Sequence, residues 1–342
     1  MNDKLELSIG DLLKEFCAKV GKNPLLVQGA GGNASWKDNE TLWVKASGTW
    51  LIDSQKKDIF VPVDLNHLKQ EVTNNNFSTS PKVIGDSNLK PSIETLLHAL
   101  MPHKAVVHLH AIEILAHLVR FNPEVVFNKI INDSINWSYV EYFKPGEELA
   151  KAVSRSLLKN KNTDVVFLKS HGVVIGGSCI ADIENILENL LTLLKNETNS
   201  PIKNKNKYLG PLPQLANYSL SKDSKLNQLA IDERLSKRLK DNWVLYPDHV
   251  VFLGINAAIL NQSINKKDLE NDDFNKPEFI FVLGVGVYES NKVSKSQKAQ
   301  LRCYFDILIR QPSDERLSTL SNKAIIELLN WDAEKYRQAQ SL

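Results

Sequence analysis

The chain has 342 residues, enough for about two domains. Its hydrophobic fraction of 42% and charged fraction of 24% are ordinary for a globular protein and argue against a collagen-like or largely disordered chain. The 42 basic residues nearly balance the 40 acidic ones, so we expect the chain to bind neither nucleic acid nor an anionic lipid surface.

Three features of the sequence indicate a cytoplasmic protein. No apolar run reaches the ~18–20 residues of a membrane-spanning helix, so we expect no membrane partner. Acidic residues follow Met1 where a secretory signal carries basic and apolar ones. Cys17, Cys179 and Cys303 lie far apart without a CxxC pair, which argues against a disulfide framework and a thiolate zinc site. Any metal must therefore be held by histidine and carboxylate.

The first 194 residues alternate between helical and strand patterns, with glycine, proline and capping residues between them. In chain order we expect a helix at 5–20, a glycine-bearing loop at 29–35, strands at 42–46 and 59–63, a helix from 65, a polar loop at 74–90, a helix at 93–100, a strand at 105–111, helices at 112–120 and 147–158, strands at 165–168 and 173–175, and a helix at 181–194.

A polar segment at 197–212 contains two prolines and no apolar period, and it is the predicted linker. It divides the chain into a catalytic domain at 1–196 and a C-terminal extension at 213–342. In the extension we expect helices at 226–239, 294–309 and 322–338, and strands at 249–253 and 278–287. This mixture implies α/β or α+β layering without fixing the topology.

His108 and His110 are two residues apart in the strand predicted at 105–111, so both imidazoles leave the same face. Two neutral nitrogens there can reach one divalent ion at about 2.0–2.1 Å. The alternatives are one buried and one surface histidine, or a pair that only hydrogen-bonds. His171 would complete a three-histidine site with an open position if the fold brings it near. Spacing alone does not establish that convergence.

Glu94 lies in the first turn of the helix predicted at 93–100. A carboxylate beside an open metal site serves as a general base when burial tunes its pKa toward neutrality. The alternative role is electrostatic, because acids are favoured in a helix's first turn, and Ser92 is likewise a helix cap first. The loops at 29–35 and 46–49 could present N–H groups and hydroxyls to an anion, although simple turns are the more common explanation.

In combination these motifs resemble the class II aldolase/adducin family, over roughly residues 8–196. The segments that carry the resemblance occur in the family's order and are Gly32-Asn33-Ala34-Ser35, Ala46-Ser47-Gly48, Pro91-Ser92-Ile93-Glu94, His108-Leu109-His110 and His171-Gly172. The resemblance implies an α/β fold, namely an α/β/α sandwich around a mostly antiparallel central sheet, followed here by a smaller C-terminal α/β extension.

The resemblance also implies a site and an activity. By this resemblance, a zinc ion or another divalent ion is held by His108, His110 and His171, and Glu94 is the general acid/base. The resemblance also gives a set of phosphate-binding residues, namely Gly32, Asn33, Ser47, Gly48 and Ser92. The implied enzyme is a metal-dependent aldehyde-lyase of carbohydrate metabolism, which cleaves a ketose, expected to be a sugar phosphate, reversibly through a metal-stabilised enediolate. A homo-oligomer is implied, with a tetramer favoured. The alternatives are a zinc-dependent sugar-phosphate dehydratase or epimerase on the same fold, or a non-catalytic adducin-like interaction protein.

The sequence departs from the family's pattern at two places. Ile93 stands where the aldolases have a second serine, which leaves open whether the substrate is phosphorylated. The tail, with Tyr246-Pro247-Asp248-His249 and the segment 283–287, resembles the part that follows the aldolase domain in bifunctional rhamnulose-phosphate aldolase/alcohol dehydrogenases. Because the tail has no phosphate loop and no histidine cluster, we expect it to shape the site or support assembly without a second catalytic centre.

Overall fold

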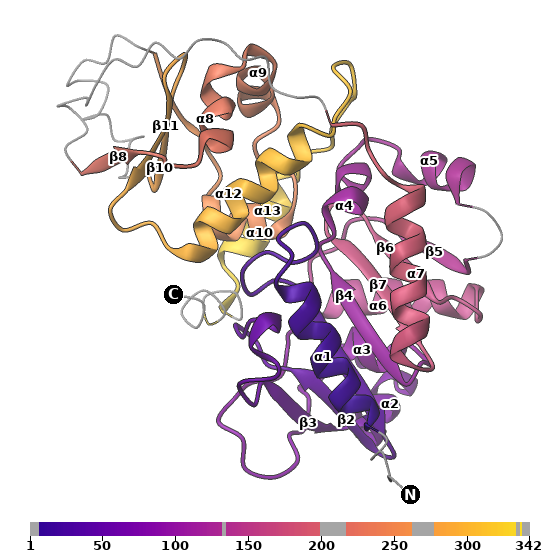
Figure 1. Cartoon of the computed structure of the whole chain (residues 1–342). Helices are drawn as coiled ribbons and strands as arrows, with labels where there is room; N and C mark the ends of the chain where they lie inside the picture. The colour runs from indigo at the N-terminus through magenta and orange to yellow at the C-terminus, as the bar shows by residue number, and fades with distance from the viewer. Residues whose placement is uncertain (1–6, 132–134, 199–216, 262–276, 333–335, 337–342) are drawn as a thin grey trace, which may run out of the picture.

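The structure is a computed structural model that describes residues 7–131, 135–198, 217–261, 277–332 and 336. A sheet of seven strands, in the order β3-β2-β1-β4-β7-β6-β5, forms the larger part, and a sheet of four strands, in the order β8-β11-β10-β9, forms the smaller one (Figure 1). The strands are β1 Asn33–Asp38, β2 Thr41–Lys45, β3 Phe60–Asp64, β4 Ala105–Leu109, β5 Trp137–Val140, β6 Val165–Leu168, β7 Gly172–Gly177, β8 Tyr218–Leu220, β9 Ala258–Leu260, β10 Phe279–Val282 and β11 Gly286–Ser290.

Helices cover both faces of the large sheet, which makes it the central layer of an α/β/α sandwich. All its neighbouring strands are antiparallel except β5 and β6. The helices are α1 Ile9–Gly21, α2 Leu65–Thr73, α3 Thr95–Leu100, α4 Ile112–Leu118, α5 Pro123–Ile130, α6 Glu147–Lys159, α7 Ile180–Leu193, α8 Ser224–Ile231, α9 Glu233–Asp241, α10 Pro247–Leu253, α12 Lys295–Leu308 and α13 Asn322–Leu329, with a short 3-10 turn η1 at Leu51–Asp53.

Alternation along the central strands divides their side chains between the two faces. Val107 and Leu109 of β4 pack with α1, α4 and α7, whereas Val106 packs with α3 and α6 on the opposite face. His108 follows Val106 by two residues and therefore points to the face that carries α3. The predicted α/β class and the mostly antiparallel central sheet are confirmed. No helix among the described residues is long and apolar enough to cross a bilayer.

Two predicted elements of the C-terminal part are wrong. Residues 249–253 form the end of helix α10, where Pro247 occupies the first turn and most side chains are buried. A short helix buried on all sides lacks a polar face, so its sequence has the same pattern as a buried strand. The strand predicted at 278–287 is the hairpin of β10 and β11, which turns at Gly284 with φ +76°.

Other differences concern boundaries and short elements. The helix predicted at 226–239 is interrupted at Asp232, which ends α8 and caps α9 by accepting from the Leu235 N–H at 3.0 Å. The helix predicted at 93–100 begins at Thr95, and the Ser92 hydroxyl accepts from the Glu94 N–H just before it. The elements β1, α5 and β5 were not predicted. Nearly all of the predicted linker, from residue 199 on, lies outside the described residues.

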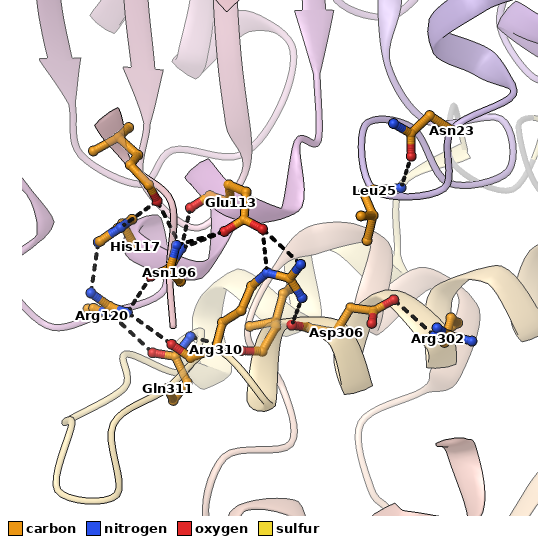
Figure 2. A network of polar contacts seen from close by, with 12 residues as sticks. Asn23, Leu25, Glu113, His117, Arg120, Asn196, Arg302, Asp306, Arg310 and Gln311 are labelled. Carbon is orange, nitrogen blue, oxygen red and sulfur yellow. Dashed lines mark hydrogen bonds and ion pairs between the residues drawn. The ribbon is translucent and has the colours of Figure 1, made fainter. Parts of the chain in front are cut away.

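A buried polar network fixes the smaller part against the larger one (Figure 2). Arg310, just after α12, donates from Nε to Glu113 Oε1 on α4 at 2.9 Å. Asn196, which immediately precedes the predicted linker, donates from both its backbone N–H and its side-chain amide to Glu113 Oε2 at 2.9 and 3.1 Å. Arg120 Nη2 in turn donates to Asn196 Oδ1 and to the Arg310 carbonyl. Apolar packing is also continuous across the boundary, because one core cluster contains side chains from both parts.

Loss of the Glu113 carboxylate should destabilise the whole chain. In Glu113→Ala the Arg310 guanidinium, whose side chain is 6% exposed, stays buried without its ion-pair partner. We expect the free energy of unfolding to fall by about 3–5 kcal/mol, the usual cost of breaking a buried pair on one side. The exposed pair of Lys19 and Glu184 is the control, since Lys19→Ala should cost less than about 1 kcal/mol. Urea unfolding of both variants measures the difference, and equal losses would contradict the interpretation.

Candidate metal centre and active site

The pairing of β4 with its two neighbours positions the first two candidate ligands. His108 lies opposite Asn33 of β1 on one side and Val174 of β7 on the other. Its Nδ1 is 3.2 Å from the Val173 carbonyl oxygen, and because a carbonyl only accepts, Nδ1 carries the proton. The lone pair of Nε2 is then free for a metal, and this atom lies 3.1 Å from Nε2 of His110.

His171 reaches the same point from the turn between β6 and β7. Its ring centroid is 4.8 Å from that of His108 and 5.5 Å from that of His110. The preceding Ser170 has φ +50°, a left-handed conformation that non-glycine residues adopt at a cost. One nitrogen from each of the three rings lies within 4.8 Å of the others, and all three residues are buried. The fold therefore brings together the three histidines that the sequence suggested.

Gly172 allows the histidines to approach this closely. A Cβ at this residue would lie 2.5 Å from the Leu109 carbonyl oxygen and 3.0 Å from Cε1 of His108. The backbone of β7 thus passes against the end of β4 where a side chain would otherwise separate them. The requirement for glycine after His171 is steric, since Gly172 does not have a positive φ.

Glu94 lies beside the three imidazoles, immediately before α3. Its Oε1 is 3.4 Å from His171 Nε2, and its Oε2 is 3.7 Å from His108 Nε2. Asn33 donates from Nδ2 to Oε2 at 2.8 Å, which orients the carboxylate. The other oxygen, Oε1, is buried and has no hydrogen-bond partner among the described residues. A buried carboxylate oxygen directed at a histidine cluster is a free acceptor for a cation or a proton.

The electrostatics of the pocket keep His108 and Glu94 in the forms that bind cations. Burial holds the pKa of His108 well below its usual value, so this ring is neutral near pH 7. Burial alone would raise the pKa of Glu94, but the positive charge that the surrounding imidazoles carry when protonated, with His108 the strongest, lowers it to about 2. Burial has therefore not tuned this pKa toward neutrality, and Glu94 is a carboxylate at neutral pH. Neutral imidazole and ionised carboxylate are both metal-ligating forms.

The arrangement fits a divalent ion. Nitrogen ligands at about 2.0–2.1 Å from a tetrahedral zinc ion lie about 3.4 Å from one another, close to the 3.1 Å between Nε2 of His108 and Nε2 of His110. Three imidazoles that leave an open position are the usual donors of a catalytic zinc site. The unpartnered Oε1 of Glu94 faces this position and is consistent with a cation there.

A cavity opens beside the histidines, and the predicted anion-binding residues line it. Gly32 and Gly48 have φ +69° and +78°, and both loops turn at these glycines. The residues around the cavity are Ala30, Gly31, Gly32, Asn33, Lys45, Ser47, Gly48, Ser92, Ile93, Glu94, His110, Pro145, His171, Pro247 and Asp248. All five predicted anion-binding residues are in this set, and so is the apolar Ile93.

Two charged residues of this cavity were missed by the sequence analysis. Lys45 is 1% exposed at the end of β2, and its Nζ donates to the Thr49 carbonyl at 2.7 Å. Asp248 comes from the C-terminal part and lies 3.4 Å from His110 Nδ1. Strand alternation gave no sign that Lys45 would be buried. Asp248 belongs to the Tyr246-Pro247-Asp248-His249 segment, just before the strand wrongly predicted at 249–253; the tail was expected to shape the site, but nothing singled out Asp248.

With this geometry established, similarity to known proteins defines the class. Residues 12–197 match the model of the class II aldolase and adducin N-terminal domain, which is more than half of the chain. The chain therefore belongs to the class II aldolase/adducin family. The matched segment contains the three histidines and Glu94 but ends before α8, so the smaller sheet and Asp248 lie outside it.

Individual relatives are distant. The chain is 26% identical over 215 residues to the uncharacterized oxidoreductase YuxG of Bacillus subtilis, covering 57% of this chain and 31% of YuxG. It is 26% identical over 181 residues to the L-fuculose phosphate aldolase of Methanocaldococcus jannaschii, covering 49% of this chain and 83% of that protein. The N-terminal class II aldolase domain of a Thermoplasma acidophilum protein has 26% identity and a TM-score of 0.47, covering 57% of this chain and 97% of that domain. The chain thus spans about a third of the length of YuxG.

A side chain at residue 172 should damage the metal centre. In Gly172→Ala the new Cβ would overlap the Leu109 carbonyl, so β7 and His171 must shift away from β4. We expect zinc affinity to fall at least tenfold and the free energy of unfolding to fall by about 1–3 kcal/mol, as for other overpacked sites. Competition with a chromophoric chelator and urea unfolding measure the two effects. Gly85→Ala is the control for zinc affinity alone, because a Cβ there meets no atom within 4 Å, although its φ of +74° makes a side chain costly for folding; an equally tight metal site in Gly172→Ala would refute the steric argument.

Proposed function

We propose that this chain is a metal-dependent aldolase that cleaves a ketose reversibly, with zinc or a similar divalent ion held by His108, His110 and His171. The observation that carries the proposal is the convergence of three buried imidazoles with a buried carboxylate whose Oε1 faces them. Membership of the class II aldolase/adducin family supports the reaction class. Retention of the complete histidine set favours an enzyme over a non-catalytic adducin-like protein.

In the proposed reaction, the bound ion and the side chains of the protein would have separate roles. A divalent ion at the three histidines would act as a Lewis acid on the carbonyl and adjacent hydroxyl of a ketose. Glu94 would accept or return the proton at the reacting carbon or oxygen, since its Oε1 points to the same place. Asn33 would hold the carboxylate in that orientation through its bond to Oε2. Burial of all these groups would exclude bulk water from the reacting atoms.

The cavity beside the histidines suits an anionic group. The backbone of Gly32 and Gly48, the Asn33 amide and the hydroxyls of Ser47 and Ser92 supply donors, and we assign them to a substrate phosphate. Ile93 lines the same cavity without a donor. One missing hydrogen bond to a charged group is worth about 1.5–3 kcal/mol, so this pocket would hold phosphate less tightly than one with a serine there. A smaller anionic group such as a carboxylate is the alternative ligand.

Aldol cleavage requires the metal centre, and removal of one ligand tests the proposal. We expect the zinc-loaded protein to release an aldehyde and a two- or three-carbon fragment from a ketose phosphate such as L-fuculose 1-phosphate. His171→Ala should lose most bound zinc and activity, whereas His67→Ala, on α2 beside Thr79, should keep both. Mass spectrometry of the products separates the alternatives, because a dehydratase removes water and an epimerase leaves the formula unchanged. Stoichiometric zinc in His171→Ala would refute its assignment as a ligand.

The proton-transfer role of Glu94 is tested by an isosteric change. Glu94→Gln keeps an oxygen for Asn33 and the shape of the pocket but removes the proton acceptor. We expect turnover to fall by about two to four orders of magnitude, the usual scale of general acid–base catalysis, with zinc still bound. Steady-state kinetics and metal analysis of the same preparation measure both quantities. Unimpaired turnover would leave Glu94 with only its place at the start of α3.

A further inference from the structure

We propose that Asp248, supplied by the C-terminal part, is a positioning residue that holds the His110 imidazole in the orientation and tautomer needed to bind the metal. The inference rests on the proposed metal centre and goes beyond the family's matched segment, which ends at residue 197. By this inference, the smaller part of the molecule contributes a residue to the candidate metal site. Two contacts and one steric observation support it.

The first contact is between the two side chains. Asp248 Oδ2 lies 3.4 Å from His110 Nδ1, and the Asp248 residue is 3% exposed. The opposite nitrogen of the same ring, Nε2, is the one that lies 3.1 Å from His108 Nε2. The two nitrogens of His110 therefore face different partners. A carboxylate beside Nδ1 favours the proton on that atom and leaves the Nε2 lone pair for a metal.

The second contact fixes the carboxylate itself. Gln300 on α12 donates from Nε2 to Asp248 Oδ2 at 3.1 Å, and Gln300 is 1% exposed. This donor and the position of Asp248 in the first turn of α10 both act on where the buried carboxylate points. A chain of side-chain contacts thus runs from Gln300 on α12 through Asp248 on α10 to His110, just after β4.

The steric observation concerns the glycine loop at 29–32. A Cβ at Gly31 would lie 3.1 Å from His110 Nδ1 and 3.3 Å from Asp248 Oδ2. A Cβ at Gly29 would lie 3.4 Å from the Ser296 hydroxyl oxygen on α12. This loop of the family domain therefore has its smallest residues where side chains of the C-terminal part approach. Gly31 leaves the space between His110 and Asp248 open.

Two of the three candidate ligands, His108 and His110, differ in the group that their Nδ1 atom faces. His108 faces the neutral carbonyl of Val173, whereas His110 faces a carboxylate. A negatively charged partner raises the basicity of a ligating imidazole and fixes its ring plane, and loss of such a partner typically costs about 10–100-fold in metal affinity. Asp248 lies outside the described group of three converging ligands, so its role is exerted through His110.

The test measures metal binding in the full-length protein, independently of any aldol reaction. Asp248→Asn removes the charge with little change of shape, Asp248→Glu restores a carboxylate, and Asp241→Asn is the control, an exposed aspartate of the same part. Zinc dissociation constants come from chelator competition, and the visible spectrum of bound cobalt reports ligand geometry. We expect Asp248→Asn to weaken zinc binding at least tenfold and to change the cobalt spectrum, with partial recovery in Asp248→Glu. Gln300→Met should weaken binding to a smaller extent, and this variant decides the matter if Asp248→Asn does not fold.

The outcomes separate this inference from the proposed function. Zinc affinity within twofold of the parent in Asp248→Asn, with an unchanged cobalt spectrum, would overturn the positioning role while leaving the aldolase proposal intact. A parent protein whose tight zinc binding depends on Asp248 but which cleaves no ketose would overturn the aldolase proposal alone. A parent protein that binds neither zinc nor cobalt would overturn both.

Discussion

The register of β4 between β1 and β7 is the constraint on which the site depends. It places His108 opposite Asn33 on one side and Val174 on the other, so a single strand position sets a candidate metal ligand next to the residue that orients Glu94. Shifting either pairing by one residue would turn the histidine to the opposite, apolar face. The glycine at the start of β7 then lets His171 close the group. The geometry of the candidate site is a consequence of sheet pairing.

The second organising feature is the buried attachment of the smaller part. Glu113 and Arg310 are charged, largely buried and linked through Asn196 to Arg120. Such a pair contributes little net free energy compared with apolar packing, but its geometry is specific. Gln300 lies within α12, and Arg310 follows the end of this helix. The contacts that hold α12 against α4 therefore also affect the position of Asp248. The attachment of the smaller part to the larger part and the position of Asp248 in the candidate site thus depend on the same helix.

Sequence patterns predicted the parts of the molecule where local rules suffice. Strand alternation at His108 and His110 gave their common face, and the motif set gave His171 and Glu94 through resemblance to the family. Lys45 and Asp248 were not predicted, because burial of a charge depends on long-range partners that no local pattern reveals. The strand predicted at 249–253 was wrong for a related reason, since a helix that is packed on all sides shows no amphipathic period.

The placement of Asp248 has a consequence for how the molecule is made. His110 and Asp248 are 138 positions apart, and Glu113 and Arg310 are 197 apart, so both contacts close very long loops. During synthesis the family domain emerges first, and its histidines can meet before the segment with Asp248 has left the ribosome. On such a chain the full-affinity metal centre would form only after the C-terminal part folds and docks. Late metal acquisition would then distinguish completed chains from unfinished ones.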